Sequence, residues 1–348
     1  MERLILVLNC GSSSLKFGLY RRGEDGPLLV REGEAEEIGG KNSSIPDHAA
    51  ALARALAIVT EPDDVSAVGH RIVHGGPDVR THQLLTPPVM ESLRAAIPFA
   101  PLHLPAALST IDATRRALPK ARQVICLDTA FHHGMPKVAK TLALPVSVRG
   151  LGIERFGFHG LSLESIMAQM DPLPERLVVA HLGNGASITA IRSGQSIDTS
   201  MGLTPSGGIM MGTRSGDIDP GTIVYLMRKG YIDVNKLESV IDRESGLLGI
   251  SETTSDVREL LRNRPEDPRA DLALEMFCYQ VAKTIASMAT ALSGLDVLVF
   301  TGGIGEHATP LREEICARLK FLGDFEVRVL PAQEDLQIAR IAEKLAAA

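Results

Sequence analysis

Two arginines in unusual surroundings are the side chains of this sequence best suited to chemistry. Arg71 stands inside the largely apolar run Val68–His74, and Arg214 lies in the glycine-containing segment Gly212–Asp217. Arginine stays charged, and its planar guanidinium group can contact two oxygen atoms of a phosphate or carboxylate at once. Both residues are therefore candidates for stabilising a transferring phosphoryl group. For Arg71 the alternative is a structural ion pair, for instance with Asp128, which closes another apolar run.

A histidine and several oxygen-bearing side chains have comparable surroundings. His159 lies in the aromatic and glycine-rich run Phe156–Gly160, where it could stabilise a phosphorus centre during transfer. Magnesium takes oxygen ligands, so Asn9, Asp128 and Glu334 are better candidates for holding it than the histidines. Each residue taken alone has a structural role as its alternative, but together they favour a site.

The ten histidines raise the alternative of a zinc site, above all His70 with His74 and His132 with His133. Neither an HExxH helix motif nor closely spaced Cys/His pairs occur in the sequence, and His70 and His74 flank a strand-like run. A metal-dependent hydrolase built on histidines is therefore the weaker hypothesis.

Several glycine turns could bring backbone N–H groups close to phosphate oxygens, because glycine permits a close approach. No GxxxxGK[ST] phosphate loop occurs. The first turn could equally be an ordinary β-turn, since Gly and Ser are common there. Taken together, the turns favour nucleotide binding. They lie in Asn9–Lys16, His181–Gly185, Gly207–Asp217 and Thr301–Glu306.

A strand–turn–strand unit that occurs twice places the first two of these turns. Leu4–Asn9 and Leu15–Tyr20 flank the first turn, and Leu177–Leu182 and Ile188–Arg192 flank the second. Two such units about half a chain apart indicate one domain used twice, with the turns facing each other across a cleft. Two unrelated hairpins are the alternative.

Helical patterns alternate with these strands, which predicts an α/β protein with largely parallel pairing outside the hairpins. Asp296–Thr301 reads as a short buried strand followed by a glycine turn, and a helix is expected from Glu334 to the end. We place the first domain at residues 1–149 and the second at 150–334. One buried helical stripe comprises Leu274, Phe277, Val281, Ile285, Met288 and Leu292.

Composition excludes several classes of protein. The 348 residues carry a formal net charge of −6, so no basic surface for nucleic acid or anionic membrane is expected. The four cysteines are far apart and form no CxxC pair, and the N-terminal run alternates like a strand rather than a signal peptide. No apolar run is long enough to span a membrane. A cytoplasmic protein is expected.

Nine blocks of this sequence, in order between residues 4 and 340, resemble the acetate kinase family. Such an ordered set is far more specific than any single glycine motif. The blocks are Asn9–Phe17, Gly69–Gly76, Ala100–His103, Leu127–His132, Phe156–Gly160, His181–Gly185, Asp198–Gly202, Met211–Pro220 and Phe300–Glu306.

The resemblance implies two duplicated ribonuclease-H-like domains, as in sugar kinases, actin and heat-shock chaperones, with mixed sheets flanked by helices and ATP in the cleft between them. It further implies a homodimer, a C-terminal helix at about 335–348 that packs on the first domain, and Mg²⁺ as cofactor, with Mn²⁺ as a substitute. The implied reaction is the reversible, ATP-dependent phosphorylation of acetate to acetyl phosphate by direct in-line transfer.

The resemblance also assigns roles residue by residue. Arg71, Asp128, His159 and Arg214 would be catalytic, and Asn9 and Glu334 would organise Mg²⁺. The nucleotide and its phosphates would contact Ser12, Ser14, Lys16, His181, Asn184, Gly185, Asp256, Arg258, Gly303 and Ile304. The carboxylate substrate would contact Arg71, Val73, Leu102, His103, Phe158 and Pro205.

Two alternatives remain beside acetate kinase. One is a kinase for propionate or another short-chain acid on the same fold. The other, from a different class, is an actin-like or chaperone-like ATPase that uses hydrolysis to switch conformation, although such a protein would not require Arg71, His159 and an apolar acyl pocket.

Val73 supplies a test of the acyl pocket. Its β-branched side chain should keep the pocket short, and an extra methylene is worth only about 1–3 kcal/mol of discrimination. Val73→Ala should therefore raise the kcat/KM ratio of propionate to acetate, measured by steady-state kinetics. An unchanged ratio would remove Val73 from the pocket.

Overall fold

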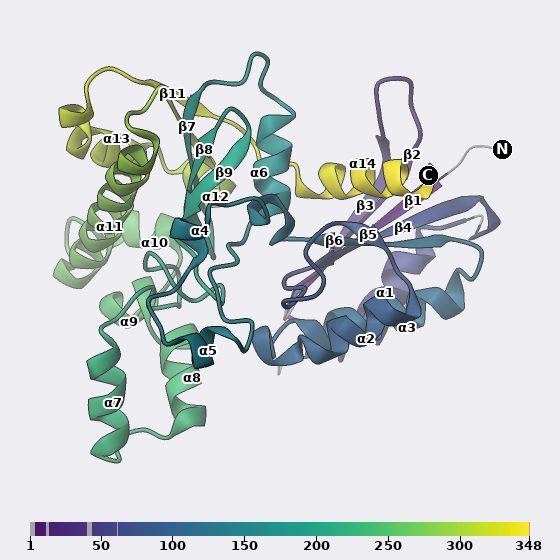
Figure 1. The fold of residues 1–348 in the computed structure, drawn as a ribbon, viewed down its shortest axis with the longest axis horizontal. Helices are drawn as coiled ribbons and strands as arrows, with labels where there is room; N and C mark the ends of the chain where they lie inside the picture. The colour runs from purple at the N-terminus through teal and green to yellow at the C-terminus, as the bar shows by residue number, and fades with distance from the viewer. Residues whose placement is uncertain (1–3, 12–13, 40–43, 61, 348) are drawn as a thin grey trace. The chain divides into compact units, whose positions relative to one another are not determined.

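The computed structural model describes residues 4–11, 14–39, 44–60 and 62–347 (Figure 1). Its internal contacts divide the chain into two compact units. Unit 1 comprises Met1–His133, Gly160–Ser165 and Gln333–Ala348, and unit 2 comprises Gly134–His159 and Ile166–Ala332. Residues 134–149, which the sequence-based boundary assigns to the first domain, group with unit 2, whereas Gly160–Ser165 return to unit 1.

Unit 1 contains a mixed sheet of six strands in the order β3-β2-β1-β4-β6-β5. The central strands β1, β4 and β6 are parallel, β1 pairs antiparallel with β2 and β2 with β3, and β5 adds an antiparallel edge to β6. The strands are β1 (Leu4–Cys10), β2 (Leu15–Arg21), β3 (Leu28–Ala35), β4 (Val65–Ile72), β5 (Gln83–Leu84) and β6 (Arg122–Leu127).

Unit 2 repeats this topology. Its order β9-β8-β7-β10-β11 matches β3-β2-β1-β4-β6, with the same antiparallel and parallel pairings. Both predicted hairpins are present, and the expected α/β fold with two mixed sheets is confirmed. The strands are β7 (Arg176–Leu182), β8 (Ala186–Arg192), β9 (Gln195–Thr199), β10 (Val297–Thr301) and β11 (Glu326–Val329).

Alternation along the strands gives the sheet of unit 1 two apolar faces. Leu6 and Leu8 belong to the core beneath α1 (His48–Ala57), α2 (Pro87–Ala95) and α3 (Leu104–Ala117). Ile5 and Val7 point to the other face, against α14 (Glu334–Ala347). Helices therefore cover both faces of this sheet.

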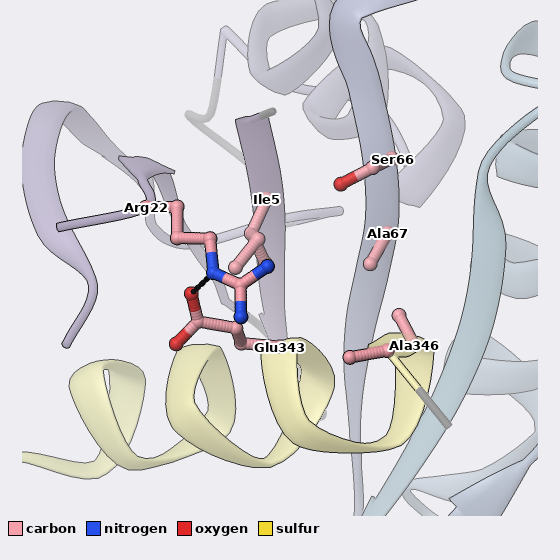
Figure 2. A pocket seen from close by; sticks show the side chains of 7 residues that line it. Ile5, Arg22, Ser66, Ala67, Glu343 and Ala346 are labelled. Atoms are coloured by element: carbon pink, nitrogen blue, oxygen red, sulfur yellow. Dashed lines mark ion pairs between the residues drawn. The ribbon is translucent and has the colours of Figure 1, made fainter. Parts of the chain in front are cut away.

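The C-terminal helix α14 contacts β1, β4 and β6. It approaches closely because β4 has a glycine there: a Cβ atom on Gly69 would lie 2.6 Å from Cγ2 of Ile338. Near the end of the helix, Glu343 pairs with Arg22 at 2.9 Å beside a hollow of about 30 Å³ (Figure 2). A hollow of this size has room for about one or two water molecules, so we assign it no ligand.

The core of unit 2 depends on α11 (Pro268–Leu292), which contacts β7, β8 and β9. All six residues of the predicted stripe, from Leu274 to Leu292, are buried. The helix ends in left-handed Ser293, with φ 60°. The glycine turn predicted after β10 is wrong: Gly302–His307 form the short helix α12, which starts at Gly302 with φ 77°.

The remaining helices are short, and within the described residues none is long and apolar enough to cross a bilayer. The residues of α6 are divided between the two units, and the short helices that follow it belong to unit 2. These helices are α4 (Lys137–Lys140), α5 (Val146–Arg149), α6 (Gly160–Met167), α7 (Pro220–Arg228), α8 (Val234–Arg243), α9 (Gly246–Ser251), α10 (Val257–Asn263) and α13 (Thr309–Arg318).

Candidate functional site

Three neighbouring parallel strands of unit 1 carry polar side chains at their carboxyl ends. Asn9 lies near the end of β1, Arg71 near the end of β4, and Asp128 directly follows β6. Two-residue periodicity puts each of them on the face that α14 covers, in line with Val7, Gly69 and Cys126. The register of the sheet thus brings together side chains that are far apart in sequence.

These side chains are joined by direct hydrogen bonds. Arg71 donates from Nε to both carboxylate oxygens of Asp128 at 3.1 Å and from Nη2 to Oδ2 at 2.6 Å. Its Nη1 donates to Oδ1 of Asn9 at 3.1 Å. The ion pair that the sequence suggested is therefore present, and it fixes the plane of the guanidinium group.

The arginine is charged in spite of its burial. Burial opposes the positive charge, but Asp128 and then Glu334 outweigh it, so the pKa of Arg71 lies above the ordinary arginine value. The Asp128 side chain is 3% exposed and that of Arg71 is 19% exposed. Such a pair is costly to desolvate and is tolerated because its geometry is good and its hydrogen bonds are satisfied.

Sequence reasoning missed one member of this cluster. Asn9 donates from Nδ2 to Oδ1 of Asp335 at 2.8 Å, a contact across 326 residues. Glu334, the residue named from sequence, stands beside it in the first turn of α14. The available signal was the adjacent Glu-Asp pair at a helix start, where acidic side chains are favoured by the helix dipole.

In unit 2, His159 lies against the end of the β7–β8 hairpin. Its Nδ1 is 2.9 Å from Oγ of Ser187, and its ring stacks on His181 with centroids 4.0 Å apart. His159 has φ 61°, a left-handed conformation that is unusual for a residue other than glycine. Strained backbone of this kind is common at functional sites.

Gly185 brings His159 and Arg214 together. A Cβ atom at Gly185 would lie 3.2 Å from Nε2 of His159 and 3.3 Å from Nη1 of Arg214. The same Nη1 donates to the carbonyl oxygen of Pro205 at 3.2 Å. A side chain at this position would crowd both groups, so the glycine in the turn after β7 leaves them room.

The hairpin turn also lies beside the start of α12. A Cβ atom on Gly183 would lie 4.0 Å from the backbone nitrogen of Gly303, whereas one on Gly303 would meet no atom within 4 Å. Asn184 is on the same turn, and its carbonyl oxygen accepts from the N–H of Gly212 at 3.4 Å. Unit 2 thus contains three of the four glycine segments that the sequence singled out, with Ile304 one residue after Gly303 on α12.

Asp256 and Arg258 form a local pair at the start of α10. Asp256 accepts from the backbone N–H of Arg258 at 2.8 Å and caps the helix. The Arg258 guanidinium lowers the pKa of Asp256 to about 2. The Arg258 side chain is 88% exposed, so the surface around it is accessible to a ligand.

The other predicted residues have less defined surroundings. Ser12 lies outside the described residues, and Ser14 accepts from the N–H of Gly11 through its carbonyl oxygen at 2.8 Å. Lys16 is on β2, 3.5 Å from Glu34 on β3. Of the acyl-pocket set, Val73 and Phe158 are buried, Leu102 and Pro205 are partly buried, and His103 occupies the N-cap position of α3.

The histidines of the zinc hypothesis have structural contacts. His70 is 2.8 Å from Oε1 of Gln123, and burial lowers the pKa of His70 to about 4, which leaves its ring neutral. His74 accepts at Nδ1 from the N–H of Gly76 at 2.9 Å. In the part of the chain that the structure describes, no three His, Cys, Asp or Glu side chains come together as a metal site.

The chain is similar to known proteins over nearly its whole length. Residues 4–338 match the profile of the Acetokinase family. Acetate kinase of Rhodopseudomonas palustris (strain TIE-1) is 39% identical over 99% of both chains, and acetate kinase 2 of Neisseria meningitidis serogroup A is 43% identical over 92% of this chain and 87% of the relative.

Solved structures are similar over the same length. The crystal structure of Porphyromonas gingivalis acetate kinase covers 99% of both chains with a TM-score of 0.87 and 34% identity. That of a propionate kinase from Francisella tularensis covers 99% of this chain and 100% of its own, with a TM-score of 0.91 and 35% identity.

The buried ion pair of unit 1 predicts a stability effect. Asp128→Ala leaves Arg71 without its carboxylate, which should lower the free energy of unfolding by about 3 kcal/mol in urea titrations. The double variant Arg71→Met with Asp128→Leu should lose less, because no charge is left unpaired. The exposed Lys120–Asp63 pair is the control, and Asp63→Asn should change stability by less than about 1 kcal/mol. Equal losses for the single and double variants would contradict this account.

Proposed function

Because the chain belongs to the acetokinase family, we propose that it transfers the γ-phosphoryl group of ATP to the carboxylate of acetate, giving acetyl phosphate and ADP in a reversible reaction. The observation that carries the proposal, beside the family match over residues 4–338, is the guanidinium of Arg71. Asp128 and Asn9 hold it in a fixed plane. A planar, permanently charged donor of this kind suits a carboxylate or a phosphoryl group.

In this proposal Asp128 orients Arg71 and does not remove a proton. An acetate carboxylate is already ionised at neutral pH, so the nucleophile needs no general base. The three contacts from Arg71 to Asp128 support the orienting role. Transfer then depends on in-line positioning and on charge stabilisation around the phosphorus.

His159 and Arg214 stabilise the transferring phosphoryl group. Their Nε2 and Nη1 atoms both lie close to Gly185, so one group could contact both. Stacking on His181 and the hydrogen bond to Ser187 restrict the ring of His159. Pre-oriented donors of this kind cost little reorganisation during the reaction.

The nucleotide binds through the glycine segments of unit 2. The open space at Gly303 and its closeness to Gly183 support a phosphate path there. Asp256 and Arg258 lie on the accessible surface at α10 and would contact the nucleoside. The proposed set comprises Ser12, Ser14, Lys16, His181, Asn184, Gly185, Asp256, Arg258, Gly303 and Ile304.

Asn9 and Glu334 would hold Mg²⁺, with Mn²⁺ as a substitute, and Asp335 adds a third oxygen donor to the set. Magnesium is commonly bound through one or two carboxylates plus substrate phosphates, and this oxygen-only set suits it. The ion would neutralise phosphate charge. The protein's own part is to keep Asn9 oriented between Arg71 and Asp335.

Acetate is the substrate we favour, and propionate is the alternative. The similar structure from Francisella tularensis is a propionate kinase. We assign the acyl group to Val73, Leu102, Phe158 and Pro205, with His103 beside the carboxylate. The enzyme is expected in the cytoplasm, in keeping with its free cysteine thiols and its use of ATP.

Formation of acetyl hydroxamate from acetate, Mg²⁺-ATP and hydroxylamine tests the function, because a switch ATPase would make none. Arg71→Ala and Arg214→Ala should each reduce kcat/KM by about a thousandfold, as expected for arginines that stabilise the transferring group. Arg328→Ala is the matched control, because the ion pair of Arg328 among the described residues is with Glu326 on a strand at the sheet edge.

A panel of acetate, propionate and butyrate with ATP and GTP defines the substrates. Hydroxamate formation that survives in both variants would overturn the assignment.

We also propose that the protein is a homodimer, through apolar side chains on and around α7 and α8. No residue of either helix is buried. Tyr231 and Val234 are 66% and 65% exposed, and Tyr225 contacts Tyr231 edge to face. Exposed tyrosine and aliphatic side chains grouped along one stretch of chain are typical of a protein interface. A second copy of the chain is the partner that we assign to this surface.

Light scattering after size exclusion checks the dimer. The wild-type protein should elute at twice the monomer mass, and Tyr231→Asp should shift it toward the monomer, because a carboxylate in an apolar contact is left unpaired. Val138→Asp is the control, since Val138 is 90% exposed but lies on α4. A wild-type monomer, or a Tyr231→Asp variant that stays dimeric, would refute the assignment.

A further inference from the structure

A chain of hydrogen bonds in unit 1 connects the strand end that carries Asp128 with the helix start that carries Glu334. The backbone N–H of Leu127 donates to Nδ1 of His82 at 3.0 Å. Nε2 of His82 is 2.9 Å from Oε1 of Glu164, and Nε2 of Gln337 donates to Oε2 of Glu164 at 3.0 Å. We call His82, Glu164 and Gln337 the Glu164 bridge.

The ring of His82 accepts a hydrogen bond from β6 that a backbone carbonyl of a longer β5 strand would otherwise accept. β5 is only two residues long, and its ladder with β6 ends at the pair Gln83 and Ile125. The next N–H that β6 presents along this edge, two residues on, is that of Leu127. A backbone N–H can only donate, so Nδ1 of His82 accepts and its Nε2 carries the proton toward Glu164. Neighbouring bonds therefore fix both the ring orientation and its tautomer.

On the strand side, the bridge acts next to the carboxylate that orients Arg71. Asp128 follows Leu127 directly, its N–H donates to the carbonyl of Ile72 at 3.0 Å, and its own carbonyl accepts from the N–H of Gly160 at 2.7 Å. Gly160 and Glu164 are one turn apart on α6, so this helix holds the end of β6 at two points.

On the helix side, the bridge acts on the first turn of α14. Gln337 is three residues after Glu334 and therefore lies on the same side of the helix. A second link runs beside it, because the N–H of Gln333 donates to the buried Oγ of Ser165 at 3.1 Å. The first turn that presents Glu334 and Asp335 is thus tied to α6 by consecutive residues, Glu164 and Ser165.

The low solvent exposure of the Glu164 bridge favours its hydrogen bonds. The side chains of His82 and Glu164 are 16% and 19% exposed, so water competes weakly for them. Both oxygens of Glu164 are engaged, one by the β6 side and one by the α14 side. A carboxylate acceptor makes stronger hydrogen bonds than a neutral one.

From this geometry we propose that His82 and Glu164 are positioning residues of the reaction. They hold Asp128, which orients Arg71, and the acidic first turn of α14 in one arrangement. The inference rests on the proposed function, since that function assigns Asp128 and Glu334 their roles. Residues that support metal ligands in this way typically change metal affinity or activity about 10- to 100-fold when they are replaced.

The full-length enzyme tests the proposal through matched variants. Glu164→Ala breaks both arms of the bridge and should raise the Mg²⁺ concentration for half-maximal rate, or lower kcat, at least about tenfold. Glu164→Gln should stay close to wild type. Its amide oxygen can accept from His82, and its amide nitrogen can donate to Oε1 of Gln337, an atom without a hydrogen-bond partner among the described residues. Glu343→Ala, which removes a carboxylate further along α14, should leave the Mg²⁺ dependence unchanged.

Hydrogen–deuterium exchange gives a readout that is independent of activity. Glu164→Ala should accelerate exchange in peptides covering residues 124–129 and 333–340, with no change in the β7–β8 hairpin. Gln337→Met cuts only the helix arm, so it should accelerate exchange in 333–340 alone, and it carries the test if Glu164→Ala does not fold. Faster exchange in these peptides together with the altered Mg²⁺ dependence is the expected result.

The two proposals fail in different ways. Wild-type protein that forms no acetyl hydroxamate overturns the proposed function, and with it the catalytic part of this inference. Active wild-type protein whose Glu164→Ala variant keeps the same kcat, Mg²⁺ dependence and exchange overturns this inference alone. A Glu164→Gln variant as impaired as Glu164→Ala would also overturn it, because the hydrogen-bond geometry would then not be the cause.

Discussion

The ion pair between Arg71 and Asp128 is the interaction on which the first unit of this protein depends. A guanidinium and a carboxylate at the ends of two buried parallel strands would destabilise the fold if either were left alone. They are accepted because the β4–β6 register aligns them for three hydrogen bonds. The pairing of β1 with β4 brings Asn9 beside Arg71, and Asn9 in turn donates to Asp335 on the last helix. A charge that the core would otherwise exclude is thereby held ready to contact an anion.

The two units share one strand topology but differ in the residues at the ends of their central strands. Strands β1, β4 and β6 correspond to β7, β10 and β11 in order and direction. In unit 1, the central strands carry Asn9, Arg71 and Asp128 at or next to their ends. In unit 2, β7 carries His181 next to its last residue, Leu182, and a glycine turn follows, while β10 leads directly into α12 at Gly302. The framework fixes where strand ends lie, and the residues at those ends decide what each can bind.

Long-range contacts, rather than local ones, complete the candidate site of unit 1. The helix α14 comes from the end of the chain, and the start of α6 comes from its middle, yet both are held against the end of β6. Gly69 permits the close approach of Ile338, and His82 supplies the acceptor that the two-residue strand β5 cannot provide. These contacts constrain the backbone near the candidate side chains.

The sequence by itself determined the elements and the main charged residues. Apolar residues that recur every two positions located both hairpins, and those that recur every three or four positions located the buried stripe of α11. Charged residues inside apolar runs indicated Arg71 and Asp128. All these signals are local. Tertiary structure decided the rest. It made a helix of Gly302–His307, it grouped residues 134–149 with unit 2, and it brought Asp335 to Asn9 and Glu164 to His82. These partners are separated by 326 and 82 residues, and no spacing along the chain reports which side chains a sheet register and a returning helix will bring into contact.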